Sequence, residues 1–218
     1  MPEVKEHTIR EIDVELIEGY KNIKPEHGTT PEHARAYVDG RFQKSGDTEK
    51  LDNTDTTKVY YDDNGDIYRR GNKLEPNKSF EINGYIYSTD KQGRTITAEG
   101  QLRLKQPDLK RNMDSMQDIG KGNQIEGDHR GHTIAFQFGG SGGLENLTAM
   151  SGELNRGDYL KMEIRLSKAV RAGSSVYLKV QMVYSGDSYR PVKYRVSYSI
   201  DGLRTTVTFR NEGGEKYD

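Results

Sequence analysis

Two short stretches of the chain carry side chains that could together hydrolyse a phosphodiester bond. The first is Gly-Asp-His-Arg-Gly-His at residues 127–132, where His132 offers an imidazole that can take a proton from water near neutral pH. The second is Leu-Asn-Arg-Gly at residues 154–157, where Asn155 offers a neutral amide oxygen, and Glu163 follows eight residues later. Oxygen ligands suit a hard cation such as Mg²⁺, which keeps several of its waters when a protein binds it. These residue types therefore indicate metal-dependent hydrolysis with a histidine base.

The whole stretch DHRGHTIAFQFGGSGGLENLTAMSGELNRGDYLKME resembles the DNA/RNA non-specific endonucleases that contain a ββα-metal (His-Me) finger. In that family Asp-x-Gly-His is followed by an Asn-Leu pair, then by Leu-Asn-Gln/Arg-Gly, and then by a glutamate. The resemblance implies that His132 is the general base and that Asn155 binds a Mg²⁺ ion, or another divalent cation such as Mn²⁺. It also implies supporting roles for Asn146 and Glu163, and an α+β fold in which the finger packs on an antiparallel β-sheet.

The stretch departs from the family pattern at two positions. Where some members carry an acidic residue three positions before the catalytic histidine, this chain has His129, and Asp128 lies one residue earlier. Where some members carry an arginine one helical turn after the glutamate, this chain has Ser167. The departure at Ser167 leaves open which arginine stabilises the transition state.

Arginines near the motif are candidates for binding the substrate. Arg130 and Arg156 flank the two principal groups, and a guanidinium can hold a phosphate through two hydrogen bonds, which lysine cannot do. Arg94 and Arg103, in or beside predicted strands, are weaker candidates for the same role. Each of them also has an ordinary interpretation as a surface arginine.

The proposed catalytic groups have structural alternatives as well. His132 could be a buried structural histidine, Asn155 could cap a helix, and Glu163 could lie on a solvent-facing helix surface. His129 and His132 form an His-x-x-His pair, which also raises the possibility of structural zinc. Zinc needs further ligands, and the chain has no cysteine to supply them.

Charge divides the chain into two parts. Residues 1–75 carry 12 basic and 17 acidic side chains, a net charge of −5, whereas residues 76–218 carry 21 basic and 17 acidic, a net charge of +4. Binding to a phosphate backbone favours the positive part. We therefore predict an acidic connector or partner-binding segment at 1–75 and a nuclease domain at 76–218.

The hydrophobic pattern predicts elements along the whole chain. We expect a strand within 1–20, a short helix at 31–40, a polar linker at 45–58, strands within 79–104, an irregular loop at 105–123, both finger strands within 124–138, a flexible connector at 139–143, a helix at 152–172 and an antiparallel meander from 176 to 209. The helix should bury a stripe of residues that begins at Tyr159, and Asn155 should lie in its first turn.

Composition limits the remaining possibilities. The chain is 32% hydrophobic and 31% charged, with 14 tyrosines and no tryptophan, which predicts a modest core rich in tyrosine. No apolar run approaches the 18 residues or so that a membrane-spanning helix requires. No motif resembles a DNA-recognition helix or an RNA-stacking platform. This favours a site that binds the phosphate groups of DNA and RNA alike.

The wider chain, from about Leu74 onward, resembles the nuclease toxin domains of secreted bacterial effectors, among them those of the staphylococcal type VII secretion system. That resemblance implies an antibacterial toxin, which a dedicated immunity protein holds inactive in the cytoplasm of the producing cell. Two other functions stay open: a finger-fold module that binds nucleic acid without cutting it, and an interaction protein whose functional part is residues 1–75.

Overall fold

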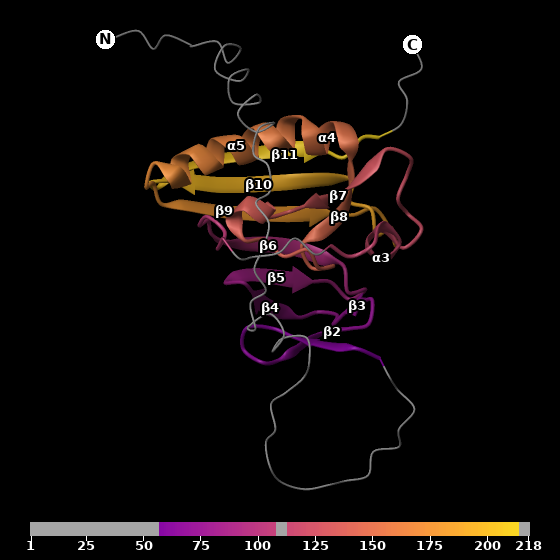
Figure 1. Ribbon diagram of the computed structural model, residues 1–218. Coiled ribbons are helices and arrows are strands. Elements are labelled where there is room, and N and C mark those ends of the chain that lie inside the picture. The colour runs from indigo at the N-terminus through magenta and orange to yellow at the C-terminus, as the bar shows by residue number, and fades with distance from the viewer. Residues whose placement is uncertain (1–56, 108–112, 214–218) are drawn as a thin grey trace, which may run out of the picture. The chain divides into compact units, whose positions relative to one another are not determined.

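The structure is a computed structural model that describes residues 57–107 and 113–213 of the chain. The strand predicted within 1–20, the helix predicted at 31–40 and most of the linker predicted at 45–58 lie outside these residues. Within them, the fold is α+β, as the sequence predicts: antiparallel sheets carry a small number of helices on one side (Figure 1).

A six-stranded antiparallel sheet forms the platform of the molecule, in the order β11-β10-β9-β6-β5-β4 (Figure 1). Its strands are β4 (Ser79–Ile82), β5 (Tyr85–Thr89), β6 (Thr95–Gln101), β9 (Val176–Val183), β10 (Lys193–Ile200) and β11 (Leu203–Arg210). Both predicted groups of strands are therefore confirmed, and the pairing of β6 with β9 joins them into one sheet.

Two tight turns set the register of this sheet. Asn83-Gly84 joins β4 to β5 and Asp201-Gly202 joins β10 to β11, and all four residues have positive φ, from 49° to 85°. Such turns match the twist of the strands that they connect, and they require residues that tolerate the left-handed region. Because side chains alternate along a strand, each turn also decides which side chains face the core.

The core lies between this sheet and the long helix α5 (Asp158–Arg171), which runs alongside β10 and β11 in Figure 1. Tyr159, at the start of α5, places its ring 5.8 Å from the ring of Tyr194 on β10 and 5.4 Å from that of Phe209 on β11. The predicted helical stripe is thus confirmed, and with it the predicted tyrosine-rich core, because Tyr85 and Tyr87 are also fully buried.

A small three-stranded sheet precedes the platform, with β1 (Val59–Tyr61), β2 (Ile67–Arg70) and β3 (Lys73–Leu74) in that order. Its Tyr68 packs on the platform, with its ring centroid 4.9 Å from that of Phe80. Residues 57–74 therefore share the hydrophobic core of the residues that follow them. The division of the chain into an acidic segment at 1–75 and a nuclease domain at 76–218 stays a prediction.

The finger consists of β7 (Asp128–His132), β8 (Leu147–Ser151), the short helix α4 (Gly152–Arg156) and α5. Two predictions for this region are wrong. Only the first finger strand lies within 124–138, and the second follows the glycine-rich loop. The segment at 139–143 is not an open connector either: Gly140 is buried, and a side chain there would collide with the carbonyl group of Ile134.

The helix predicted at 152–172 is broken into two at Gly157, whose ψ of −113° lies outside the helical range. Asn155 lies in the short first piece and Glu163 in the second, so helical periodicity alone does not relate the two side chains. Gly173, with φ of +87°, ends α5, as the sequence predicts.

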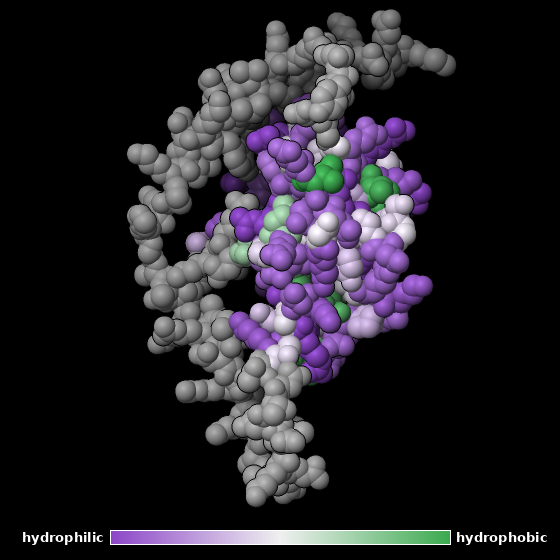
Figure 2. Space-filling view, turned by 90° about the vertical axis from the view of Figure 1, so that its right-hand side faces the viewer, coloured by the Kyte–Doolittle hydropathy of each residue, from purple (hydrophilic) through white to green (hydrophobic). Residues whose placement is uncertain are grey.

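The predicted loop at 105–123 contains one further short helix, α3 (Met116–Gly120). Its cap was readable in the sequence, since the hydroxyl of Ser115 accepts a hydrogen bond from the backbone N–H of Asp118. Figure 2 shows a face of the molecule that is mostly hydrophilic, with isolated apolar groups. None of the helices in the described part of the chain is long and apolar enough to cross a membrane.

Candidate active site

The hairpin of β7 and β8 brings the first motif next to the second. The two strands pair antiparallel, with Asp128 opposite Ser151 and His132 opposite Leu147. Helix α4 begins directly after β8 and therefore lies at the end of the hairpin where β7 starts. Since residues three apart in a strand point to opposite faces, His129 and His132 are not arranged to bind one zinc ion together.

Asn155 lies beside β7. Its amide Nδ2 is 3.3 Å from Nδ1 of His129, a contact that spans 26 residues of sequence. Because an amide nitrogen only donates, Nδ1 of the ring is the acceptor in this contact. The sequence pairs Asn155 with His132 through the family motif, whereas the direct contact in the structure is with His129.

Glycine at position 152 makes room for the His129 ring. A Cβ atom at this position would lie 2.8 Å from Nε2 of His129 and 2.7 Å from the carbonyl oxygen of Gly127. The backbone N–H of Gly152 donates to that same carbonyl oxygen over 3.0 Å. The first turn of α4 therefore packs directly against Gly127 and the His129 ring.

His132 is buried at the far end of β7, with 7% of its surface exposed. The strand continues into Thr133, whose carbonyl oxygen accepts a hydrogen bond of 2.8 Å from the hydroxyl of Tyr159 on α5. His132 is therefore followed at once by a residue that is tied to the helix, which fixes the backbone at that point.

Asn146 holds the loop between the two strands. It is fully buried, and its Oδ1 accepts hydrogen bonds from the Thr133 hydroxyl at 2.6 Å and the Ile134 N–H at 2.8 Å. Its Nδ2 donates to the carbonyl oxygens of Ile134 and Ser141 at 2.9 and 2.8 Å. The amide is therefore engaged with the loop that follows His132.

Glu163 is half-buried on α5, one turn after Tyr159. Burial raises the pKa of Tyr159, and the nearby carboxylate of Glu163 adds to the increase. This places Glu163 close to the side chain that holds Thr133, on the helix that covers the hairpin.

The four candidate arginines separate into two groups. Arg130 and Arg156 are exposed; Nη1 of Arg130 has a long contact of 3.4 Å with the carbonyl oxygen of Asp114. Arg94 is instead committed to Asp90 and to the carbonyl groups of residues 186 and 188, and Arg103 donates to the carbonyl oxygen of Asn83. Arg103 is nevertheless exposed, as Arg130 and Arg156 are, whereas Arg94 is half-buried.

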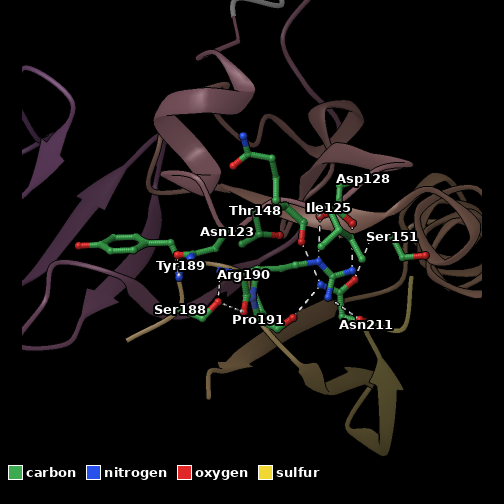
Figure 3. Close-up of polar contacts among 12 residues, drawn as sticks. Asn123, Ile125, Asp128, Thr148, Ser151, Ser188, Tyr189, Arg190, Pro191 and Asn211 are labelled. Atoms are coloured by element: carbon green, nitrogen blue, oxygen red, sulfur yellow. Dashed lines mark hydrogen bonds and ion pairs between the residues drawn. The ribbon is translucent and has the colours of Figure 1, made fainter. Parts of the chain in front are cut away.

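No motif in the sequence points to Arg190 and Asn211, which fasten the hairpin to the platform (Figure 3). Nε and Nη2 of Arg190 donate to the Asp128 carboxylate at 2.8 and 2.9 Å, and Nη1 donates to the backbone carbonyl of Asn211 at 2.7 Å. The Asn211 side chain accepts from Ser151 N–H at 2.7 Å and donates to the carbonyl oxygens of Ala149 and Pro191.

This cluster, which we call the Arg190–Asn211 clamp, joins the residue before His129 to the residue before α4. No spacing rule links these positions, since about 60 residues separate the partners. Asp128, one residue before the position where some family members carry an acidic residue, was the only available signal, because a buried carboxylate requires a cationic partner.

The antiparallel hairpin followed by a helix, with histidines on the strand and an asparagine in the first helical turn, defines a ββα-metal-finger nuclease. Residues 76–202 match the family model of the DNA/RNA non-specific endonucleases, so the chain belongs to that family. It is accordingly a phosphodiester hydrolase.

Known proteins agree with this assignment. The chain is 33% identical over 151 residues to the type VII secretion system protein EssD of Staphylococcus aureus, in the strains USA300 and Newman. That match covers 66% of this chain and 24% of EssD, so the chain spans about a quarter of the length of these relatives. Among solved structures, NucA of Streptococcus agalactiae with a magnesium ion bound has the same fold, with a TM-score of 0.51 and 16% identity over 64% of this chain and 76% of NucA.

Proposed function

We propose that the chain is a metal-dependent endonuclease that cuts DNA and RNA without sequence preference. The observation that carries this proposal is the seating of Asn155 against the start of the histidine-bearing strand β7, with its amide nitrogen turned toward His129. That orientation leaves the amide oxygen to serve as a ligand. NucA, with the same fold, was solved with magnesium bound.

The residues at this site fit a hard divalent cation. A single amide oxygen on a short helix, with the half-buried Glu163 on the next helix, provides few protein ligands and leaves the remainder to water, as Mg²⁺ prefers. Bound there through Asn155, Mg²⁺ or Mn²⁺ would neutralise charge that develops on the phosphate as the bond breaks. We assign to Glu163 the role of holding a water molecule at the site.

His132 is the proposed general base. Its imidazole takes a proton from the water that attacks the phosphorus atom, and the buried position keeps the ring in one orientation. Asn146 fixes the loop after His132 from one side and Tyr159 fixes Thr133 from the other. Both are positioning residues in this scheme.

The substrate is held by its phosphates. Arg130 and Arg156 are exposed and flank the two motifs, so both can reach a backbone that lies across the hairpin. Contacts to phosphate carry no sequence information, which is why cleavage of DNA and RNA is expected without base preference. Because these contacts are ionic, binding should weaken steeply as salt concentration rises.

We further propose that the chain is the toxic part of a secreted bacterial effector that uses a type VII route. The relationship to EssD, a type VII secretion system protein, supports this proposal. An immunity protein would then hold the nuclease inactive in the cytoplasm of the producing cell. The test is expression of the active chain in a bacterial cytoplasm, which should degrade the chromosome unless the product of a neighbouring gene is made with it. Growth unaffected by the active chain would contradict the toxin.

Cleavage of plasmid DNA and of a structured RNA by the purified chain tests the nuclease. Cutting should occur with Mg²⁺ or Mn²⁺, stop with EDTA, and fall by at least about 100-fold in His132→Ala, the usual contribution of a general base. Asn155→Ala should need far more metal. Arg210→Met, at an exposed position on β11, is the matched control and should cut like wild type.

If His132→Ala cuts as fast as wild type, His132 is not the base. If the wild-type chain binds DNA and does not cut it with either metal, a non-cleaving nucleic-acid-binding module replaces the endonuclease.

A further inference from the structure

We infer that His129 is the positioning residue of the metal site: it holds the amide of Asn155 so that the oxygen atom, and not the nitrogen atom, faces the metal. The inference rests on the proposed function, because it takes Asn155 to be the metal ligand. It concerns one of the two positions where the chain departs from the family pattern, His129.

The geometry supports this role in two ways. Nδ2 of Asn155 donates to Nδ1 of His129 over 3.3 Å, which turns Oδ1 of the amide to the opposite side. The His129 ring packs closely against the first turn of α4, because a Cβ atom at Gly152 would lie only 2.8 Å from its Nε2. Strand β7 fixes the backbone of His129 through its ladder with β8. The acceptor is therefore carried by a paired strand and packed on one side by Gly152.

Such a contact matters because an amide has two nearly identical orientations. A rotation of about 180° about the last side-chain bond exchanges the oxygen, which binds cations, for an NH₂ group, which repels them. A fixed acceptor on one side removes the unproductive orientation before the metal arrives. Outer groups that orient a ligand in this way typically change metal affinity or activity by about 10–100-fold when they are removed.

Two substitutions separate this role from simple packing. His129→Leu keeps the bulk of the side chain and removes the acceptor. His129→Asn places an oxygen near the position of Nδ1 and so restores an acceptor on a smaller side chain. If His129 only fills space, the asparagine variant should be the worse of the two. If it orients Asn155, the asparagine variant should be the better.

The experiment is calorimetric titration of the full 218-residue chain with MnCl₂ and with MgCl₂, without nucleic acid. We expect His129→Leu to weaken Mn²⁺ affinity by about 10–100-fold, and His129→Asn to recover most of that loss. Equal affinity in wild type and His129→Leu would overturn the inference, as would His129→Asn binding as weakly as His129→Leu. Thermal melts establish that each variant is folded.

Two further measurements distinguish the positioning role of His129 from loss of folding and from direct metal binding by His129. If His129→Leu does not fold, His129→Gln replaces it, since glutamine carries its acceptor near the Nε2 position and should not rescue binding. If His129 were itself a ligand, His129→Asn would exchange nitrogen for oxygen and alter the ratio of Mn²⁺ to Mg²⁺ affinity, because imidazole favours the transition metal. An altered ratio therefore also overturns the positioning role.

The inference and the proposed function fail in different ways. If Asn155→Ala binds metal as tightly as wild type, Asn155 is not the ligand, and both the positioning role of His129 and the ligand role assigned to Asn155 are wrong. If Asn155→Ala loses the metal and His129→Leu keeps it, the proposed function stands and only the positioning role of His129 is wrong.

Discussion

Removing the guanidinium of Arg190 should destabilise the protein more than any change on its surface. The side chains of Arg190 and Asp128 are only 12% and 1% exposed, and two hydrogen bonds of 2.8 and 2.9 Å join them. In Arg190→Met the Asp128 carboxylate stays buried and keeps one backbone donor, the N–H of Ile125 at 3.0 Å. Breaking a buried pair in this way costs about 3–5 kcal/mol of unfolding free energy.

That cost is measurable in two assays. Urea denaturation gives the free energy of unfolding directly, and for a chain of this size a loss of about 3–5 kcal/mol lowers the melting temperature by roughly 6–20 °C. Arg210→Met is the matched control, because Arg210 and its partner Glu212 are 80% and 76% exposed. The control should change the free energy by less than about 0.5 kcal/mol.

A second variant tests the reason for the loss. Asp128→Asn combined with Arg190→Met removes the uncompensated charge, so the double variant should recover about 1–2 kcal/mol over Arg190→Met. A loss below about 1 kcal/mol in Arg190→Met would refute the reasoning. A double variant less stable than Arg190→Met would show that the buried charge is not what destabilises the protein.

Three further predictions concern other parts of the hairpin and helix. Gly157→Ala should lower the free energy of unfolding by about 1–3 kcal/mol in urea denaturation, and it should also weaken metal binding. The reason is that a ψ of −113° is rare for a residue with a side chain, and a Cβ atom there would lie 2.6 Å from the Glu153 carbonyl oxygen. Burial raises the pKa of Glu145 in the folded protein. The stability of wild type relative to Glu145→Gln should therefore be greatest below the pKa that Glu145 has in the unfolded chain, and it should fall as pH rises through the pKa of the folded protein. A difference in melting temperature that does not depend on pH would contradict this. Tyr194→Phe removes the buried hydrogen bond of 2.8 Å between the hydroxyl groups of Tyr194 and Thr148 on β8. It should lower the free energy of unfolding by about 1–3 kcal/mol in the same assay, because the Thr148 hydroxyl stays buried without its partner.

Local patterns were enough to predict the strands of the platform, but not the pairing of β6 with β9 that joins them into one sheet. Alternation from Val176 to Phe209, together with Asn-Gly and Asp-Gly turns, specifies strands and register from residues that are close in sequence. The finger was harder, because its second strand follows a glycine-rich loop, and a glycine can serve close packing as well as flexibility. Gly140 is the clearest case, since the backbone of Ile134 occupies the place of a side chain. Composition cannot distinguish these two uses of glycine.

The candidate site was predicted as a set of residues, and its internal contacts were not. The family motif names His132 and Asn155, which the structure places on β7 and α4. It does not name His129 as the neighbour of Asn155, because that contact depends on where α4 begins relative to the start of β7. The break at Gly157 is a further example, since a regular helix would have placed Glu163 on the same face as Asn155.

The need for the Arg190–Asn211 clamp follows from the size of the finger. Two strands of five residues form a hairpin that is marginally stable by itself, yet a metal ligand and a base must be held to a fraction of an ångström. The rigidity therefore has to come from outside the motif. The clamp supplies it at the end of the hairpin that carries His129 and α4, and Asn146 and Tyr159 supply it at the end that carries His132. A chain with the complete motif and without these partners would be expected to fold its sheet and to lose its activity.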